Sequence, residues 1–124
     1  YICRNQIKKG ISGMKGLLKS FKGKSSIALM IDQRVSEGIK CNFFGKEALT
    51  TTIPAQFVKK FNAKIVLVYI ERLKNNKFKI KYQNPLVFDD NTSTESITLK
   101  LNQEIEKMIL NNPEQWIWTH NRWK

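Results

Sequence analysis

The sequence has few of the residues that build common catalytic and metal sites. It contains a single histidine, His120, and its two cysteines, Cys3 and Cys41, lack metal-ligand spacing. A glycine-rich phosphate loop and a nucleophile elbow are also missing. General acid–base catalysis needs a positioned base. A lone histidine between aromatic residues near a terminus is usually a structural or surface residue and not such a base. The sequence therefore offers no convincing catalytic base, and we expect no metal and no cofactor.

Long apolar runs are missing too. The longest one covers residues 65–70, far short of the roughly 20 residues that cross a bilayer. No signal-peptide pattern is present. Two cysteines without a framework of others favour free thiols in a reduced, cytosolic setting over a disulfide scaffold.

Acidic residues are scarce relative to basic ones. The chain has 10 Asp and Glu against 22 Lys and Arg, which gives a net charge of +12. Such a charge favours an acidic partner, which could be nucleic acid, an anionic membrane, a phosphorylated substrate or an acidic protein. A lysine-rich proteome explains the charge equally well. The lysines are spread along the chain and no RNA- or DNA-binding motif is present, which disfavours nucleic acid.

The 124 residues allow one modest domain over 1–124, and a hydrophobic content of 41% excludes a disordered chain. Alternating helical and extended patterns predict an α/β fold. Strands are expected over residues 26–31, 38–44, 64–72 and 78–82, with a turn at Asn75–Asn76. Helices are expected between Ser12 and Gly23, from Thr50–Thr52 to about Phe61, and from a capping box at Thr92–Glu95 to Asn111. The last helix is expected to bury Ile97, Leu101, Ile105, Met108 and Ile109.

The best candidate for a site follows the apolar run at residues 26–31. Continuous apolar character indicates a strand buried on both faces, as in a parallel sheet. Asp32 and Gln33 come directly after it. Because ligands bind at the carboxyl ends of strands in α/β sheets, Asp32 is either a site residue or a cap for the following turn.

Two further features each admit two interpretations. Phe43, Phe44 and Gly45 either pack in the core or form the apolar wall of a pocket, with Gly45 allowing close approach. Arg72 ends the strand expected at 64–72, where its planar guanidinium suits an ion pair or a phosphate contact.

The C-terminal segment PEQWIWTHNRWK combines tryptophans with cations. It is either a packed aromatic tail or an anchor at the membrane interface. If residues 113–119 are helical, Trp116 and His120 share one face. We expect the tryptophans to close the core and Arg122 and Lys124 to point outward, with Arg122 as the candidate for a lipid-phosphate contact.

These motifs occur together in a known order. Asp32–Gln33, Gly38, Phe43–Gly45, the threonine-rich stretch at 50–72, Asn84–Leu86 and the closing PEQWIWTHNRWK follow one another. In this order they resemble the C-terminal half of the lipid A biosynthesis acyltransferases, the lauroyl and myristoyl transferase family of Gram-negative bacteria. The resemblance runs from about Ile7 to the end of the chain, and the closing pattern is specific.

The resemblance implies a glycerolipid-acyltransferase-like sheet flanked by helices, of which this chain would be the C-terminal portion. The family moves a fatty acyl chain from acyl carrier protein to a hydroxyl of a Kdo-bearing lipid A precursor, at the cytoplasmic face of the inner membrane. Its catalytic pair, a histidine and an acid separated by four residues, lies upstream of the region matched here. We therefore expect an acyltransferase whose catalytic residues and membrane anchor are not in this chain, and no activity from this chain alone.

Substrate-binding residues are expected at Asp32, Gln33, Phe43, Phe44, Gly45, Thr51 and Arg72. The phosphorylated acceptor, the acidic carrier protein and the anionic membrane would all be attracted to a basic surface. Two other interpretations stay open. The chain could be a basic module that binds anionic lipid or nucleic acid without catalysis, or a degenerate homologue without its active half.

Overall fold

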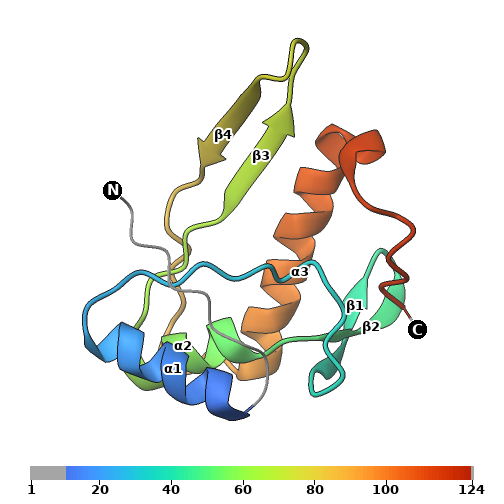
Figure 1. Ribbon diagram of the computed structural model, residues 1–124. Coiled ribbons are helices and arrows are strands. Elements are labelled where there is room, and N and C mark those ends of the chain that lie inside the picture. The colour runs from blue at the N-terminus through green and yellow to red at the C-terminus, as the bar shows by residue number, and fades with distance from the viewer. Residues whose placement is uncertain (1–10, 124) are drawn as a thin grey trace. The chain divides into compact units, whose positions relative to one another are not determined.

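The computed structural model describes residues 11–123, so Cys3 and Lys124 lie outside the described residues (Figure 1). The chain divides into two compact units, residues 1–30 and 31–124, which are treated separately. Helices, strands and one 3₁₀ helix follow in the order α1 (Ile11–Lys22), β1 (Ile39–Phe43), β2 (Lys46–Thr50), α2 (Ile53–Phe61), β3 (Val68–Arg72), β4 (Phe78–Tyr82), α3 (Thr94–Asn111) and η1 (Pro113–Gln115). The predicted mixture of helices and strands is confirmed.

In the first unit, the described residues are α1 and the segment that follows it. The helix ends at the predicted place, where the Gly23 N–H bonds the Lys19 carbonyl at 3.0 Å. Ser12 lies inside the helix and not before it. The buried strand predicted at 26–31 is wrong: these residues have no strand conformation, and Met30 is 80% exposed. An apolar run forms a strand only where a neighbouring strand supplies hydrogen-bond partners, and among the described residues none pairs with this run.

In the second unit, β1 and β2 form an antiparallel hairpin with Phe43 opposite Lys46. Its two-residue turn is Phe44–Gly45, with φ of +51° and +74°. Positive φ at both positions matches the twist of a hairpin and favours glycine, whereas it is unusual for phenylalanine. The turn is held because the Phe44 N–H donates to the Glu106 carboxylate of α3 at 2.7 Å.

Helix α2 begins and ends close to the predicted residues. Pro54 occupies its first turn, and Asn62 ends it in the left-handed conformation, with φ of +50°. The predicted capping box of α3 is shifted by one residue. Ser93 is the cap, and its hydroxyl accepts the Ser96 N–H at 3.1 Å.

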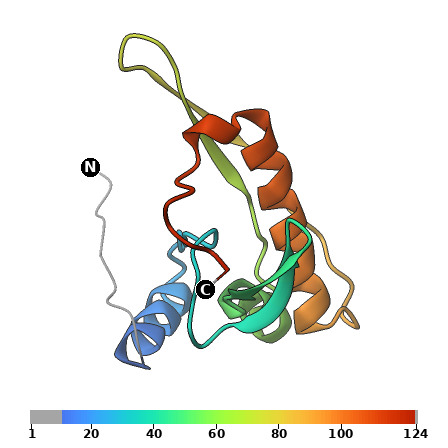
Figure 2. The same ribbon diagram turned by 90° about the vertical axis from the view of Figure 1, so that its right-hand side faces the viewer.

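Helix α3 carries the core of the second unit and packs against both β1 and α2 (Figure 2). All five residues predicted on its apolar face are buried. Ile97, Leu101 and Met108 pack with Ala55 and Leu67. A second cluster contains Ile105 and Ile109 of α3 with Phe43 and Ala48 of the β1–β2 hairpin.

Strands β3 and β4 form a second antiparallel hairpin, turned at Asn75–Asn76 as predicted. One face carries apolar side chains that are 45–73% exposed: Val68, Ile70, Phe78, Ile80 and Tyr82. The other face carries Tyr69 toward the core and a Glu71–Lys81 ion pair. The described residues thus contain two separate antiparallel hairpins, and a parallel pair is not found among them.

Candidate functional site

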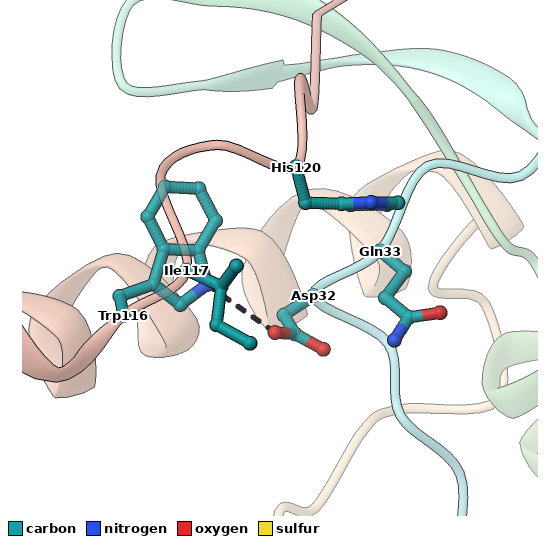
Figure 3. A pocket seen from close by; sticks show the side chains of 5 residues that line it. All are labelled: Asp32, Gln33, Trp116, Ile117 and His120. Carbon is teal, nitrogen blue, oxygen red and sulfur yellow. Dashed lines mark hydrogen bonds between the residues drawn. The ribbon is translucent and has the colours of Figure 1, made fainter.

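Asp32 is positioned by the residue before it and by an indole from the C-terminal tail. Ile31 packs against both core clusters, which fixes the chain just ahead of Asp32. The Nε1–H of Trp116 donates to Oδ2 of Asp32 at 3.2 Å (Figure 3). This bond joins residues 84 positions apart, so the site exists only when the tail is in place.

Asp32 and Gln33 line a pocket of about 140 Å³ together with Trp116, Ile117 and His120. In Figure 3 the Asp32 carboxylate lies between the Trp116 indole and Gln33, and the His120 imidazole lies above Gln33. The structure therefore brings the two best candidates from the sequence together with three residues that the sequence had not assigned a binding role. The four-residue spacing of Trp116 and His120 does not explain their meeting, because residues 116–120 are not helical, and no other local signal in the sequence points to them.

The tail is held over the β1–β2 hairpin by three hydrogen bonds to its backbone and to a hydroxyl. The Trp123 Nε1–H donates to the Phe43 carbonyl at 2.9 Å. The Arg122 guanidinium donates through Nη1 to the Leu49 carbonyl at 2.6 Å and through Nη2 to the Thr50 hydroxyl at 2.7 Å. Figures 1 and 2 show the tail returning from the end of α3 to this hairpin. These contacts fix the wall of the pocket that carries Trp116 and His120.

The expectation that Arg122 points outward is wrong. Its side chain is fully buried, and its guanidinium lies 5.1 Å from the centre of the Phe43 ring. Burial lowers the pKa of Arg122, and attraction to Asp32 and Cys41 opposes this shift. A fully buried guanidinium that donates through Nη1 and Nη2 to internal acceptors is not available to a lipid phosphate, so Arg122 is a structural residue, although its buried Nε finds no acceptor among the described residues.

An aromatic cluster explains why two phenylalanines precede Gly45. The ring of Phe43 lies 5.9 Å from Trp116 and 5.8 Å from Trp123. Trp116 in turn packs edge-to-face on Trp118 at 4.6 Å. Phe44 extends the cluster, at 4.9 Å from Phe43. Such pairs stabilise beyond the area that they bury, and here they hold the indole that bonds Asp32.

Five of the seven expected substrate-binding residues do not line the Asp32 pocket, and four of these five have structural roles. Phe43 is fully buried in the core, and Phe44 packs on it at the hairpin turn. Gly45 is exposed, and a side chain there would meet open space, so its backbone angle and not close approach requires glycine. Thr51 is buried, and its hydroxyl accepts the Ile53 N–H at the start of α2. The structure gives each of the four a structural role.

Arg72 lies at a second, more open hollow, of about 220 Å³, lined also by Ile70, Phe78 and Gln115. The backbone of Arg72 bonds the Gln115 side chain in both directions. This hollow shares no lining residue with the Asp32 pocket, and it combines apolar side chains with a cation.

Within residues 11–123, no group of three or more His, Cys, Asp and Glu side chains could hold a metal ion. Over the same residues, no helix has the length and apolar character needed to cross a membrane. The Asp32 pocket instead offers a carboxylate, a carboxamide and an imidazole. These groups bind ligands through hydrogen bonds to hydroxyl and amide groups.

Comparison with protein families gives a match over nearly the whole chain. The family model described as bacterial lipid A biosynthesis acyltransferase matches residues 4–124, which is nearly the whole chain. A search of curated proteins gives no match.

Proposed function

Because the chain belongs to the bacterial lipid A biosynthesis acyltransferase family, we propose that it forms part of an enzyme that acylates a Kdo-bearing lipid A precursor. The acyl donor is acyl carrier protein, and the acceptor atom is a hydroxyl oxygen of the precursor. The family match over residues 4–124 is the observation that carries this proposal. A glycerolipid-acyltransferase-like sheet, completed by polypeptide outside this sequence, is part of the same proposal.

Asp32 and Gln33 are proposed to bind the acceptor. Both line one pocket, and the Trp116 indole holds one oxygen of the Asp32 carboxylate while the pocket stays open. The carboxylate and the carboxamide can orient a hydroxyl group by accepting and donating hydrogen bonds. This role is one of binding and orientation, not of proton abstraction.

The base that activates the acceptor hydroxyl is proposed to lie outside this sequence. The one histidine, His120, is exposed and lies in the closing tail after α3, whereas the family's histidine–acid pair is expected ahead of the region matched here. The exposed apolar face of the β3–β4 hairpin also supports a larger domain, since a patch of this kind marks an interaction site. We expect the 124-residue chain alone to transfer no acyl group.

Arg72 is proposed as the contact for a lipid phosphate, the role that Arg122 cannot fill. Arg72 lines the same hollow as Ile70 and Phe78, so a phosphate could bind the arginine while an adjoining acyl chain contacts the apolar residues. The net charge of +12 supports binding of the anionic inner membrane at its cytoplasmic face and of the acidic carrier protein.

The test is acyl transfer from acyl carrier protein to a Kdo-bearing lipid A precursor, followed by mass spectrometry of the lipid. The full-length enzyme that contains this chain should add one acyl group, and the 124-residue chain should add none. A full-length enzyme that binds the precursor but never acylates it would overturn the proposed reaction. Transfer by the chain alone would overturn the proposal that the base lies elsewhere.

A further inference from the structure

We propose that the Asp32 pocket receives an uncharged, hydroxyl-bearing sugar ring of the acceptor, and neither its phosphate nor its acyl chains. This inference rests on the proposed function and adds which part of the substrate the pocket takes. The pocket is formed by two segments, Asp32–Gln33 and Trp116–His120, so both sides of a bound ring would find protein groups.

The size of the pocket suits one six-membered ring. Its volume is about 140 Å³, and a cavity of about 150 Å³ in another protein accommodates a benzene molecule. Because this pocket is open on one side, the hydroxyl groups and substituents of a sugar can project out of it. An elongated acyl chain would extend well beyond the two lining segments.

The polar groups of the pocket match those of a sugar. Among the described residues only Trp116 donates a hydrogen bond to Asp32, and it uses Oδ2, which leaves Oδ1 as an acceptor. Gln33 supplies a donor and an acceptor, and a neutral His120 supplies one of each. A sugar hydroxyl both donates and accepts, so adjacent hydroxyls can bond several of these groups at once. Beside them, the Trp116 ring and Ile117 offer apolar surface for the C–H groups of a sugar ring.

The charge of the pocket excludes a phosphate. Asp32 is the acid in its lining, and among residues 11–123 no lysine or arginine lines it. Arg122 is close enough to interact with Asp32, but it is fully buried and donates to Leu49 and Thr50. A phosphate in this pocket would therefore face a carboxylate without a cationic donor, and like charges at such range repel.

Trp116 is the positioning residue of this site. The bond from its Nε1–H fixes the orientation of the Asp32 carboxylate, and the rings of Phe43 and Trp118 fix the indole. Its indole N–H also gives a local probe, because its NMR resonance should respond when a ligand bonds Asp32.

The experiment is an NMR titration of the ¹⁵N-labelled 124-residue chain at about pH 8. The probes are N-acetylglucosamine, N-acetylglucosamine 1-phosphate and inorganic phosphate. The neutral sugar should shift the indole resonance of Trp116 and the side-chain amide of Gln33, with a Kd on the order of 10 mM. Inorganic phosphate should leave both resonances unchanged.

Variants separate the role of charge from that of shape. Asp32→Asn keeps an oxygen that accepts from Trp116 but removes the negative charge. The ratio of the affinity for N-acetylglucosamine 1-phosphate to the affinity for N-acetylglucosamine should therefore rise about fivefold. The matched control is Glu47→Gln, which removes the same charge from an exposed ion pair with Lys40 and should leave that ratio unchanged. His120→Ala replaces an exposed residue and should weaken binding of the neutral sugar about threefold.

A neutral sugar that leaves the Trp116 resonance unmoved up to roughly 100 mM would overturn the inference. So would inorganic phosphate that shifts this resonance as strongly as the sugar does. Acyl transfer by the full-length enzyme, combined with either of these results, would leave the proposed reaction standing and remove only the sugar site. Loss of acyl transfer in an enzyme that still binds the sugar would remove the proposed reaction and leave the sugar site standing.

Discussion

The side-chain amide of Gln115 pairs with the backbone of Arg72 in both directions. The Arg72 N–H donates to Oε1 at 2.8 Å, and Nε2 donates to the Arg72 carbonyl at 3.0 Å. A side chain thus pairs with the edge of β3 that faces away from β4, and it ties the hairpin to η1. An edge whose backbone groups already have partners is also protected from pairing with another chain.

Replacing Gln115 by Glu should destabilise the second unit by about 1–2 kcal/mol, because a carboxylate cannot donate to the Arg72 carbonyl and leaves it unpaired. Urea unfolding followed by tryptophan fluorescence measures the change. Gln103→Glu, the same replacement at an exposed position of α3, is the control and should cost little. Equal stabilities of the two variants would show that the paired amide contributes nothing.

Replacing Arg122 by Gln should cost roughly 2–3 kcal/mol, since the buried guanidinium supplies charge-assisted bonds to Leu49 and Thr50. Lys46→Gln removes a positive charge from the exposed first residue of β2 in the same hairpin and should change stability by less than about 0.5 kcal/mol. Chemical denaturation of both variants gives the comparison. An Arg122→Gln protein as stable as the control would mean that the burial of Arg122 adds no stability.

Replacing Asp32 by Ala in the full-length enzyme should lower turnover at least about 10-fold, the low end for a residue that orients a substrate. Stability should change little, because Asp32 is only partly buried and its one bond to Trp116 is long. Trp116→Phe keeps an aromatic ring but removes the donor, and should lower turnover less than Asp32→Ala does. If melting temperature and activity collapse together in Asp32→Ala, Asp32 is structural.

Those features of the fold that depend on local pattern could be predicted from the sequence. The 3.6-residue period of α3 placed all five apolar residues correctly, because a helix buries one stripe whatever its neighbour is. The turn at Asn75–Asn76 followed from residues that tolerate positive φ. Asp32 and Gln33, proposed as site residues at the end of a predicted strand, line one pocket although that strand does not form, so their role in binding stays a prediction.

Features that depend on distant partners could not be predicted. The strand predicted at 26–31 does not form, because an apolar run needs a neighbouring strand to supply backbone hydrogen-bond partners, and its own sequence does not show whether one is present. Arg122 was expected outside because arginine is seldom fully buried, and the carbonyl and hydroxyl that satisfy it lie more than 70 positions away. Trp116 and His120 join the site through the same return of the tail, which no local period encodes.

Stability should fall at alkaline pH through Cys41. Burial raises the pKa of this thiol, so the folded chain holds the proton more tightly than the unfolded chain does. The stabilisation is complete below the pKa of the unfolded thiol and is lost as the pH rises through the folded pKa. The free energy of unfolding should therefore decrease above about pH 8.5. Cys41→Ala has no thiol here to titrate, and its unfolding free energy should change less over the same range. Parallel curves for the two proteins would exclude Cys41 as the cause.

Replacing Arg72 by Gln should weaken binding to vesicles that contain anionic phospholipid, because Arg72 lies beside the exposed apolar residues Ile70 and Phe78. The control is Lys79→Gln, which removes the same charge from the opposite face of the hairpin. Near an anionic surface each cation contributes about 1 kcal/mol, so Arg72→Gln should weaken binding about fivefold and Lys79→Gln clearly less. Co-sedimentation at low and high salt measures both. Equal losses would show that the membrane attracts total charge and not this face. No loss in either variant would favour polypeptide, and not lipid, as the cover of the hairpin.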